Sequence, residues 1–131
     1  MKVLVDTCIW SKALRYKEPD LTVVKKLTTL IENGQAVIIG PIKQEILSGI
    51  PDKQQFEKLK KLLRAYEEIP LTAEMFEKGA EFCNICRGKG VQGSTIDFLI
   101  CSVAALKGMA VYTDDKDFKE YVKHIPFKLF T

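Results

Sequence analysis

Short strand-like runs alternate with longer helical patterns along most of the chain, and this alternation limits the folds open to it. The strand-like runs lie at Lys2–Val5, Ala36–Ile39, Glu68–Pro70, Ala110–Tyr112 and Phe127–Phe130. Helical patterns lie between them, at Leu21–Glu32, 41–48, Lys53–Tyr66, 72–88, 94–107 and Phe118–Lys123. Strands separated by helices in this way form parallel sheets with helices on both faces. We therefore expect an α/β fold of three layers, α/β/α, around a central, mostly parallel sheet of four to five strands.

Helix-terminating and helix-capping residues support these boundaries. Asn33-Gly34 follows the first long helical pattern, and Pro41 suits the first position of the next helix. Asp52, Thr72 and Ser94 each stand where an N-cap is needed. The stretch 41–66 contains two helical patterns and no strand signal, so it is predicted to form a helical hairpin.

Size and composition indicate a soluble protein of one domain, covering residues 1–131. Hydrophobic residues make up 47% and charged residues 28%, and the net charge of +3 permits a nucleic-acid partner without proving one. The apolar run Val3–Val5 is too short for a signal peptide, and Phe98–Leu106 is too short to span a bilayer. A cytoplasmic protein is expected. Its four cysteines are interpreted as reduced thiols in apolar settings; they are Cys8, Cys83, Cys86 and Cys101.

Several carboxylates interrupt or end apolar segments. Asp6 ends the first strand, and Asp115 and Asp117 follow the fourth. In a common doubly wound order these two strands are neighbours, and ligands bind at the carboxyl ends of strands there. Three carboxylates are therefore expected on one rim. Glu45 lies beside an apolar helical stripe and is predicted to lean toward the core, and Asp97 is the only charged residue in 96–106.

Taken singly, these acids also have structural explanations. Asp6 fits the N-cap of a helix starting near Thr7, and Asp97 fits a reciprocal cap with Ser94. Taken together, four ionised carboxylates about 5 Å apart would repel one another by roughly 3 kcal/mol per pair, on the order of 20 kcal/mol in total. That exceeds the roughly 5–15 kcal/mol stability of a domain. Such a cluster needs raised pKa values or a cation, and oxygen-only ligation favours Mg²⁺ or Mn²⁺ over zinc.

Four segments resemble those of the PIN-domain ribonucleases, and most closely the VapC-type toxins of prokaryotic toxin–antitoxin pairs. The segments are Val5-Asp6-Thr7, Glu45-Ile46-Leu47-Ser48-Gly49, Asp97-Phe98-Leu99-Ile100 and Thr113-Asp114-Asp115-Lys116-Asp117-Phe118. The resemblance implies a Mg²⁺- or Mn²⁺-dependent endoribonuclease, a cognate antitoxin partner and a homodimer. It also implies a catalytic and metal-binding set, which is Asp6, Glu45, Asp97 and Asp115.

Two departures from the family pattern bear on these assignments. Asp114 adds an acid where the family usually has an uncharged or basic residue, so the roles of Asp114, Asp115 and Asp117 remain open. Asp117 is expected to be an accessory metal ligand or to support one. Cys101-Ser102 replaces a more usual pair of alanines, which is expected to affect packing rather than chemistry.

The predicted function is hydrolysis of RNA phosphodiester bonds, with the particular RNA left open. Basic side chains must attract the RNA to an acidic site, and the candidates are Lys12, Arg15, Lys43, Arg87 and Lys89, of which the last four are favoured. Thr7 and Thr113 are placed to hydrogen-bond the acids or the substrate. The alternative is a non-catalytic RNA-binding or regulatory PIN-domain protein. A phospho-acceptor receiver domain fits poorly, because the third strand ends at Pro70 without an aspartate.

Overall fold

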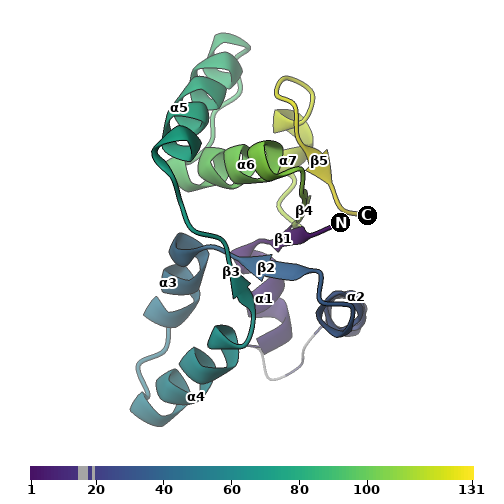
Figure 1. Ribbon diagram of the computed structural model, residues 1–131, viewed down its shortest axis with the longest axis vertical. Coiled ribbons are helices and arrows are strands. Elements are labelled where there is room, and N and C mark those ends of the chain that lie inside the picture. Colours follow the sequence, from purple (N-terminus) through teal and green to yellow (C-terminus); the bar gives the residue numbers. More distant parts are fainter. Residues whose placement is uncertain (15–17, 19) are drawn as a thin grey trace.

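The computed structural model describes residues 1–14, 18 and 20–131. Within this part of the chain a parallel sheet of five strands has the order β3-β2-β1-β4-β5 (Figure 1). The strands are β1 (Val3–Val5), β2 (Ala36–Ile38), β3 (Glu67–Glu68), β4 (Ala110–Tyr112) and β5 (Lys128–Leu129). The predicted α/β class and parallel sheet are confirmed.

Helices connect the strands and pack around the sheet (Figure 1). They are α1 (Thr7–Leu14), α2 (Leu21–Glu32), α3 (Gly40–Ser48), α4 (Lys53–Arg64), α5 (Ala73–Gly88), α6 (Thr95–Lys107) and α7 (Asp117–Tyr121). Asp52, Thr72 and Ser94 cap α4, α5 and α6 through their side chains, as predicted. Helices α3 and α4 contact each other, as the predicted hairpin requires.

Two predicted boundaries in the middle of the chain are wrong by two residues or fewer. Helix α4 ends at Arg64 rather than Tyr66, and β3 is Glu67–Glu68 rather than 68–70. The chain must leave the helix earlier because Glu67 and Glu68 pair with Val37 and Ile38 of β2. Tertiary pairing here overrides the local helical pattern.

The central strand β1 places the first acid at the rim of the sheet. Val3 and Leu4 pair with β2 on one side, and Val3 to Val5 pair with β4 on the other. All three β1 residues are buried, which explains the unbroken apolar run in the sequence. The backbone N–H of Asp6 then donates to the carbonyl of Tyr112 at 2.9 Å, so Asp6 emerges directly beside the end of β4.

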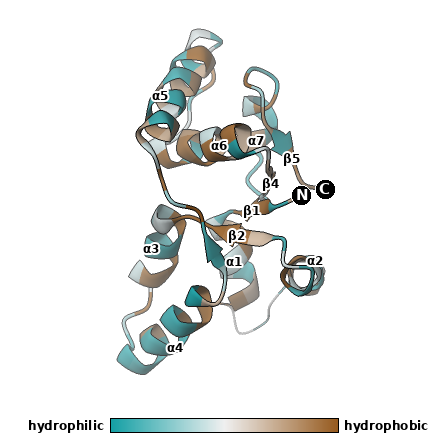
Figure 2. Cartoon of the chain, viewed as in Figure 1, coloured by the Kyte–Doolittle hydropathy of each residue, from teal (hydrophilic) through white to brown (hydrophobic). Residues whose placement is uncertain are grey.

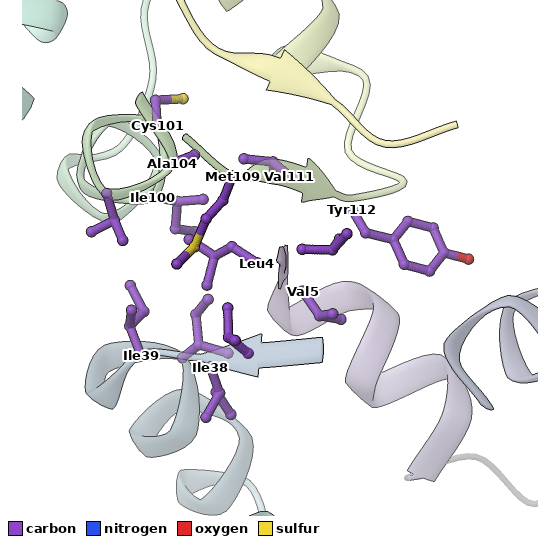
Figure 3. Close-up of a cluster of buried hydrophobic side chains, with 14 of the residues drawn as sticks. Leu4, Val5, Ile38, Ile39, Ile100, Cys101, Ala104, Met109, Val111 and Tyr112 are labelled. Carbon is purple, nitrogen blue, oxygen red and sulfur yellow. The ribbon is translucent and has the colours of Figure 1, made fainter. Parts of the chain in front are cut away.

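The core between the sheet and α6 fixes the position of that helix. Leu4, Ile38 and Ile100 are buried and their side chains converge in this layer (Figure 3). Strands β1 and β2 are hydrophobic, whereas α4 is largely hydrophilic (Figure 2). On its other side α6 packs closely on α5, because a Cβ atom at Gly79 would stand 3.4 Å from the carbonyl oxygen of Phe98.

The remaining sequence predictions about membranes and thiols can be compared with the structure. No helix in the described ranges is both long enough and apolar enough to cross a bilayer. All four cysteines are free thiols. The expectation of an apolar setting is wrong for Cys8. Its Sγ atom lies 3.7 Å from Asp6 Oδ2 and 3.5 Å from Thr113 Oγ1.

Candidate metal centre

Three carboxylates converge at the carboxyl edge of the sheet, where α6 and α7 begin. Asp97, Asp115 and Asp117 each offer an oxygen, and these oxygens all lie within 4.8 Å of one another. We call these three residues the acid cluster. Asp97 lies in the first turn of α6, Asp115 follows β4, and Asp117 begins α7. Residues far apart in the sequence thus form one anionic site.

Local hydrogen bonds order the turn that carries two members of the acid cluster. The Thr113 hydroxyl oxygen accepts from the backbone N–H of Asp115 at 3.0 Å. The Asp115 carboxylate in turn accepts from the backbone N–H of Asp117 at 2.9 Å. Short polar side chains commonly form such bonds two residues along the chain, and here they hold both carboxylates at the start of α7.

Asp6 is buried next to the acid cluster, with both carboxylate oxygens hydrogen-bonded. Oδ1 accepts from the backbone N–H of Thr7 and Oδ2 from the hydroxyl of Thr113, each at 2.8 Å. Burial raises the pKa of Asp6, the hydrogen bonds oppose that rise, and the charge of Asp97 adds to it. Asp6 is only 8% exposed, so its hydrogen-bonded carboxylate is a buried charge that interacts with Asp97.

Asp97 is partly buried and receives a hydrogen bond that the sequence did not suggest. The pKa of Asp97 is raised by burial first, and also by the charges of Asp115 and Asp117. The hydroxyl of Tyr121 donates to Asp97 Oδ2 at 2.7 Å. Burial, followed by this hydrogen bond, raises the pKa of Tyr121, which keeps the phenol protonated as a donor at neutral pH. No reciprocal bond from the Asp97 carboxylate to the backbone of Ser94 is found in the described chain; only the Ser94 hydroxyl caps the helix, at 3.0 Å.

Sequence reasoning missed Tyr121 because it belongs to no acidic motif. The only available signal was its position on α7, four residues after Asp117 and three after Phe118. That spacing puts Tyr121 on the same side of the helix as both residues.

Glu45 lies at the edge of the site and not toward the core. It is exposed, because Ile42 and Ile46 occupy the buried side of α3. Its Oε2 atom accepts from the hydroxyl of Thr7 at 3.4 Å, which connects it with the Asp6 region. Among the described residues, neither Glu45 nor Asp6 belongs to the group of oxygens within 4.8 Å.

Asp114, the acid that departs from the family pattern, is directed away from the acid cluster. Its carboxylate forms an ion pair with Lys12 of α1 at 2.6 Å. This contact ties the turn after β4 to α1. The geometry therefore distinguishes Asp114 from Asp115 and Asp117, which the sequence could not do.

Comparison with protein families accounts for this arrangement. Residues 3–123 match the model of the PIN domain family. The chain belongs to the PIN domain family. The resemblance drawn from the four sequence segments is thereby confirmed. No curated protein matches the sequence.

Solved structures contain chains with the same fold as this PIN domain. One, from the structure of VapBC2 from Rickettsia felis bound to a DNA fragment from their promoter, has a TM-score of 0.80 and 25% identity, covering 99% of this chain and 98% of that one. FitAcB from Neisseria gonorrhoeae gives a TM-score of 0.81 at 19% identity, with 98% and 96% covered. A toxin–antitoxin complex from Klebsiella pneumoniae gives 0.72 at 17% identity, with 89% and 90% covered.

The basic residues predicted for RNA binding occupy different environments in the PIN domain. Lys43 is partly buried and forms an ion pair with Glu68. Arg87 and Lys89 are exposed at the end of α5, and neither is in an ion pair within the described chain. Arg15 lies outside the described residues. The structure thus leaves Arg87 and Lys89 as the predicted cations available to an incoming polyanion.

The donor set of the PIN domain fits a hard divalent cation. The acid cluster offers carboxylate oxygens, the ligands that Mg²⁺ and Mn²⁺ prefer. Burial and, to a lesser extent, repulsion raise the pKa values of Asp6 and Asp97, and a bound cation would favour the ionised form of both. Zinc sites in proteins usually include sulfur or imidazole ligands. The thiol of Cys8 contacts Asp6 and Thr113. Within the described residues it belongs to no cluster of possible metal ligands.

Proposed function

We propose that this PIN domain is a metal-dependent endoribonuclease that hydrolyses RNA phosphodiester bonds, and that it is the toxin of a toxin–antitoxin pair. The acid cluster is the observation that carries the proposal. Three carboxylates within 4.8 Å, with Asp6 beside them, are a costly arrangement unless a cation binds there. Family membership then makes nuclease chemistry the best-supported use of that cation.

Each acidic residue of the site is assigned a role from its position in the structure. Asp97, Asp115 and Asp117 would hold Mg²⁺ or Mn²⁺. When bound, that ion would activate a water molecule and neutralise charge on the phosphate in the transition state. Asp6, whose carboxylate is held by hydrogen bonds from Thr7 and Thr113, would add a further negative charge beside the three metal ligands. Glu45 is exposed at the edge, where it can contact solvent and substrate.

Substrate attraction falls to cations outside the acidic site. RNA is a polyanion, and an acidic site repels it until cations compensate. Arg87 and Lys89 are exposed and unpaired in the described chain, and they precede Asp97 by a short loop. Lys43 lies on α3 near Glu45 and is already neutralised by Glu68. We therefore assign most of the RNA attraction to the end of α5.

The partner assignment rests on the solved relatives. VapBC2 from Rickettsia felis was solved with promoter DNA, and the Klebsiella pneumoniae relative is a toxin–antitoxin complex. By analogy, this chain would bind a cognate antitoxin, and the resemblance to VapC-type toxins implies a homodimer. Co-purification of the chain with the product of the neighbouring reading frame, and loss of cleavage in that complex, are the expected results.

A cleavage assay with matched variants tests the catalytic proposal. The purified wild-type protein should cut RNA in the presence of Mn²⁺ and should not cut it in EDTA. The Asp97→Asn variant should not cut RNA in either condition. Asp52→Asn is the control, because it removes one negative charge at the cap of α4, away from α6 (Figure 1), and asparagine also caps helices well. RNA binding without cleavage by the wild type in Mn²⁺ would favour the non-catalytic alternative. Undiminished cleavage by Asp97→Asn would refute the site.

A further inference from the structure

Tyr121 is a buried side chain whose polar atom faces the acid cluster. Its exposed fraction is 0%, and its ring packs against Phe98 at 4.9 Å and Phe118 at 5.1 Å between ring centroids. Those two phenylalanines directly follow Asp97 and Asp117. The ring therefore lies between the two helix starts that carry two of the three clustered acids.

Packing of the ring does not explain why position 121 carries a hydroxyl group. A phenylalanine would make the same ring contacts, whereas the hydroxyl donates to Asp97 Oδ2 at 2.7 Å. A hydrogen bond to a carboxylate is stronger than one between neutral groups. It crosses from α7 to α6 and opposes the repulsion that Asp115 and Asp117 exert on Asp97.

Gly93 shows that the chain is built closely around this phenol. A Cβ atom at Gly93 would stand 2.2 Å from the Tyr121 hydroxyl oxygen and 2.7 Å from the ring carbon that bears it. Neither distance is sterically possible, so this position requires glycine for space alone. The loop before α6 thus packs directly against the phenol that donates to Asp97.

We propose that Tyr121 is a positioning residue that holds one oxygen of Asp97, so that the other is presented to a divalent cation together with Asp115 and Asp117. The inference rests on the proposed function, because it assumes that the acid cluster binds such a cation. Tyr121 contacts neither cation nor RNA in this scheme. It acts only through Asp97, as residues that hydrogen-bond metal ligands do.

Mn²⁺ binding by isothermal titration calorimetry tests the inference without relying on cleavage. Tyr121→Phe removes the hydroxyl and keeps the ring contacts, so Mn²⁺ affinity should fall by about 10-fold to 100-fold. Tyr66→Phe is the matched control, because it removes a phenol hydroxyl from a ring that packs against Trp10 at 5.0 Å between centroids and contacts no member of the acid cluster in the described contacts. Its affinity should equal that of the wild type.

Gly93→Ala supplies an independent test from the other side of the same contact. The added methyl would displace the Tyr121 hydroxyl, so Mn²⁺ affinity should fall here as well. Gly88→Ala is its control, because a Cβ atom there meets nothing within 4 Å. In cleavage assays, Tyr121→Phe should need more Mn²⁺ for the half-maximal rate and reach the wild-type maximum.

The outcomes separate this inference from the proposed function. Wild-type Mn²⁺ affinity in folded Tyr121→Phe overturns the positioning role alone. A lowered maximal rate with unchanged Mn²⁺ dependence also overturns it. Failure of the wild-type protein to bind Mn²⁺ overturns the proposed function, and the inference with it.

Discussion

Asp97→Asn is expected to stabilise the metal-free protein while it abolishes metal binding. Asparagine has nearly the shape of aspartate and keeps an oxygen that can accept the hydrogen bond from Tyr121. It carries no charge, so it removes the cost of burying the Asp97 carboxylate and the repulsion between position 97 and its two acidic neighbours, Asp115 and Asp117. Loss of function and gain of stability should therefore occur in the same variant.

The magnitude follows from the spacing of the oxygens. They lie within 4.8 Å of each other, and Asp115 and Asp117 are exposed, so an effective dielectric of about 40–80 applies and each pair repels by roughly 1–2 kcal/mol. The hydrogen bond from Tyr121 is weaker to a neutral acceptor than to a charged one, which lowers the free energy of unfolding by about 1 kcal/mol. With two such pairs, the net gain in free energy of unfolding is about 1–3 kcal/mol, which for a chain of this size raises Tm by roughly 3–12 °C.

The pH dependence of that gain shows whether it comes from the charge of Asp97. The folded-state pKa of Asp97 is raised above its ordinary value of 3.8, so the folded protein binds this proton more tightly than the unfolded chain does. Asp97 therefore contributes most to the stability of the wild-type protein below pH 3.8. This contribution is lost as the pH rises through the raised pKa of Asp97 in the folded state. The advantage of Asp97→Asn should be full at neutral pH and should shrink toward pH 4.

Thermal unfolding in EDTA and in Mn²⁺ is the assay, with Asp52→Asn as the control for removing one charge. In EDTA at neutral pH, Asp97→Asn should have the highest Tm of the three proteins. A Mn²⁺ concentration 100-fold above the dissociation constant should then stabilise the wild type by about 2.7 kcal/mol and leave Asp97→Asn nearly unchanged. A lower Tm for Asp97→Asn than for the wild type in EDTA at neutral pH would refute the reasoning from repulsion.

Three further predictions follow from contacts around the site. Asp114→Asn should keep wild-type Mn²⁺ affinity and change stability by less than about 1 kcal/mol, because its carboxylate forms an exposed ion pair outside the acid cluster; calorimetry and thermal unfolding measure both, and a large loss of Mn²⁺ binding would contradict the assignment. The double variant Arg87→Ala/Lys89→Ala should weaken RNA binding and reduce the slope of log affinity against log salt concentration by roughly 1–2, and an unchanged slope would show that both residues are bystanders. Ser102→Ala should lower the free energy of unfolding by about 1 kcal/mol and leave the cleavage rate unchanged, because the buried hydroxyl bonds the carbonyl of Met75 at 2.7 Å and joins α6 to α5; denaturant unfolding measures this, and a loss of cleavage would indicate a role in chemistry.

Local sequence patterns were sufficient to predict most elements of the fold. Leu21–Glu32 and Ala110–Tyr112 have the predicted boundaries, because apolar spacing and the adjacent Gly34 and Gly108 act over a few residues. The adjacency of β1 and β4 also followed from general rules of doubly wound sheets, and it predicted that Asp6 would lie near Asp115. Other boundaries were wrong by one or two residues: strand pairing ends α4 before Tyr66, and α7 is Asp117–Tyr121 rather than 118–123.

The orientation of individual carboxylates was not predictable in the same way. Glu45 seemed by helical spacing to lean toward the core, and the structure exposes it because Ile42 and Ile46 fill the buried side of α3. Asp114 and Asp115 are adjacent and chemically identical in the sequence. Only the approach of Lys12 from α1 draws one away from the acid cluster and leaves the other in it.

The sequence by itself determined the parallel α/β architecture, the rim at which acids gather and the family, because these depend on periodicity and on segments of adjacent residues. Tertiary structure decided which acids meet, and it alone revealed Tyr121 and the close fit of Gly93. Both are consequences of packing between α6 and α7, and contacts between segments so far apart leave no periodic trace in the chain.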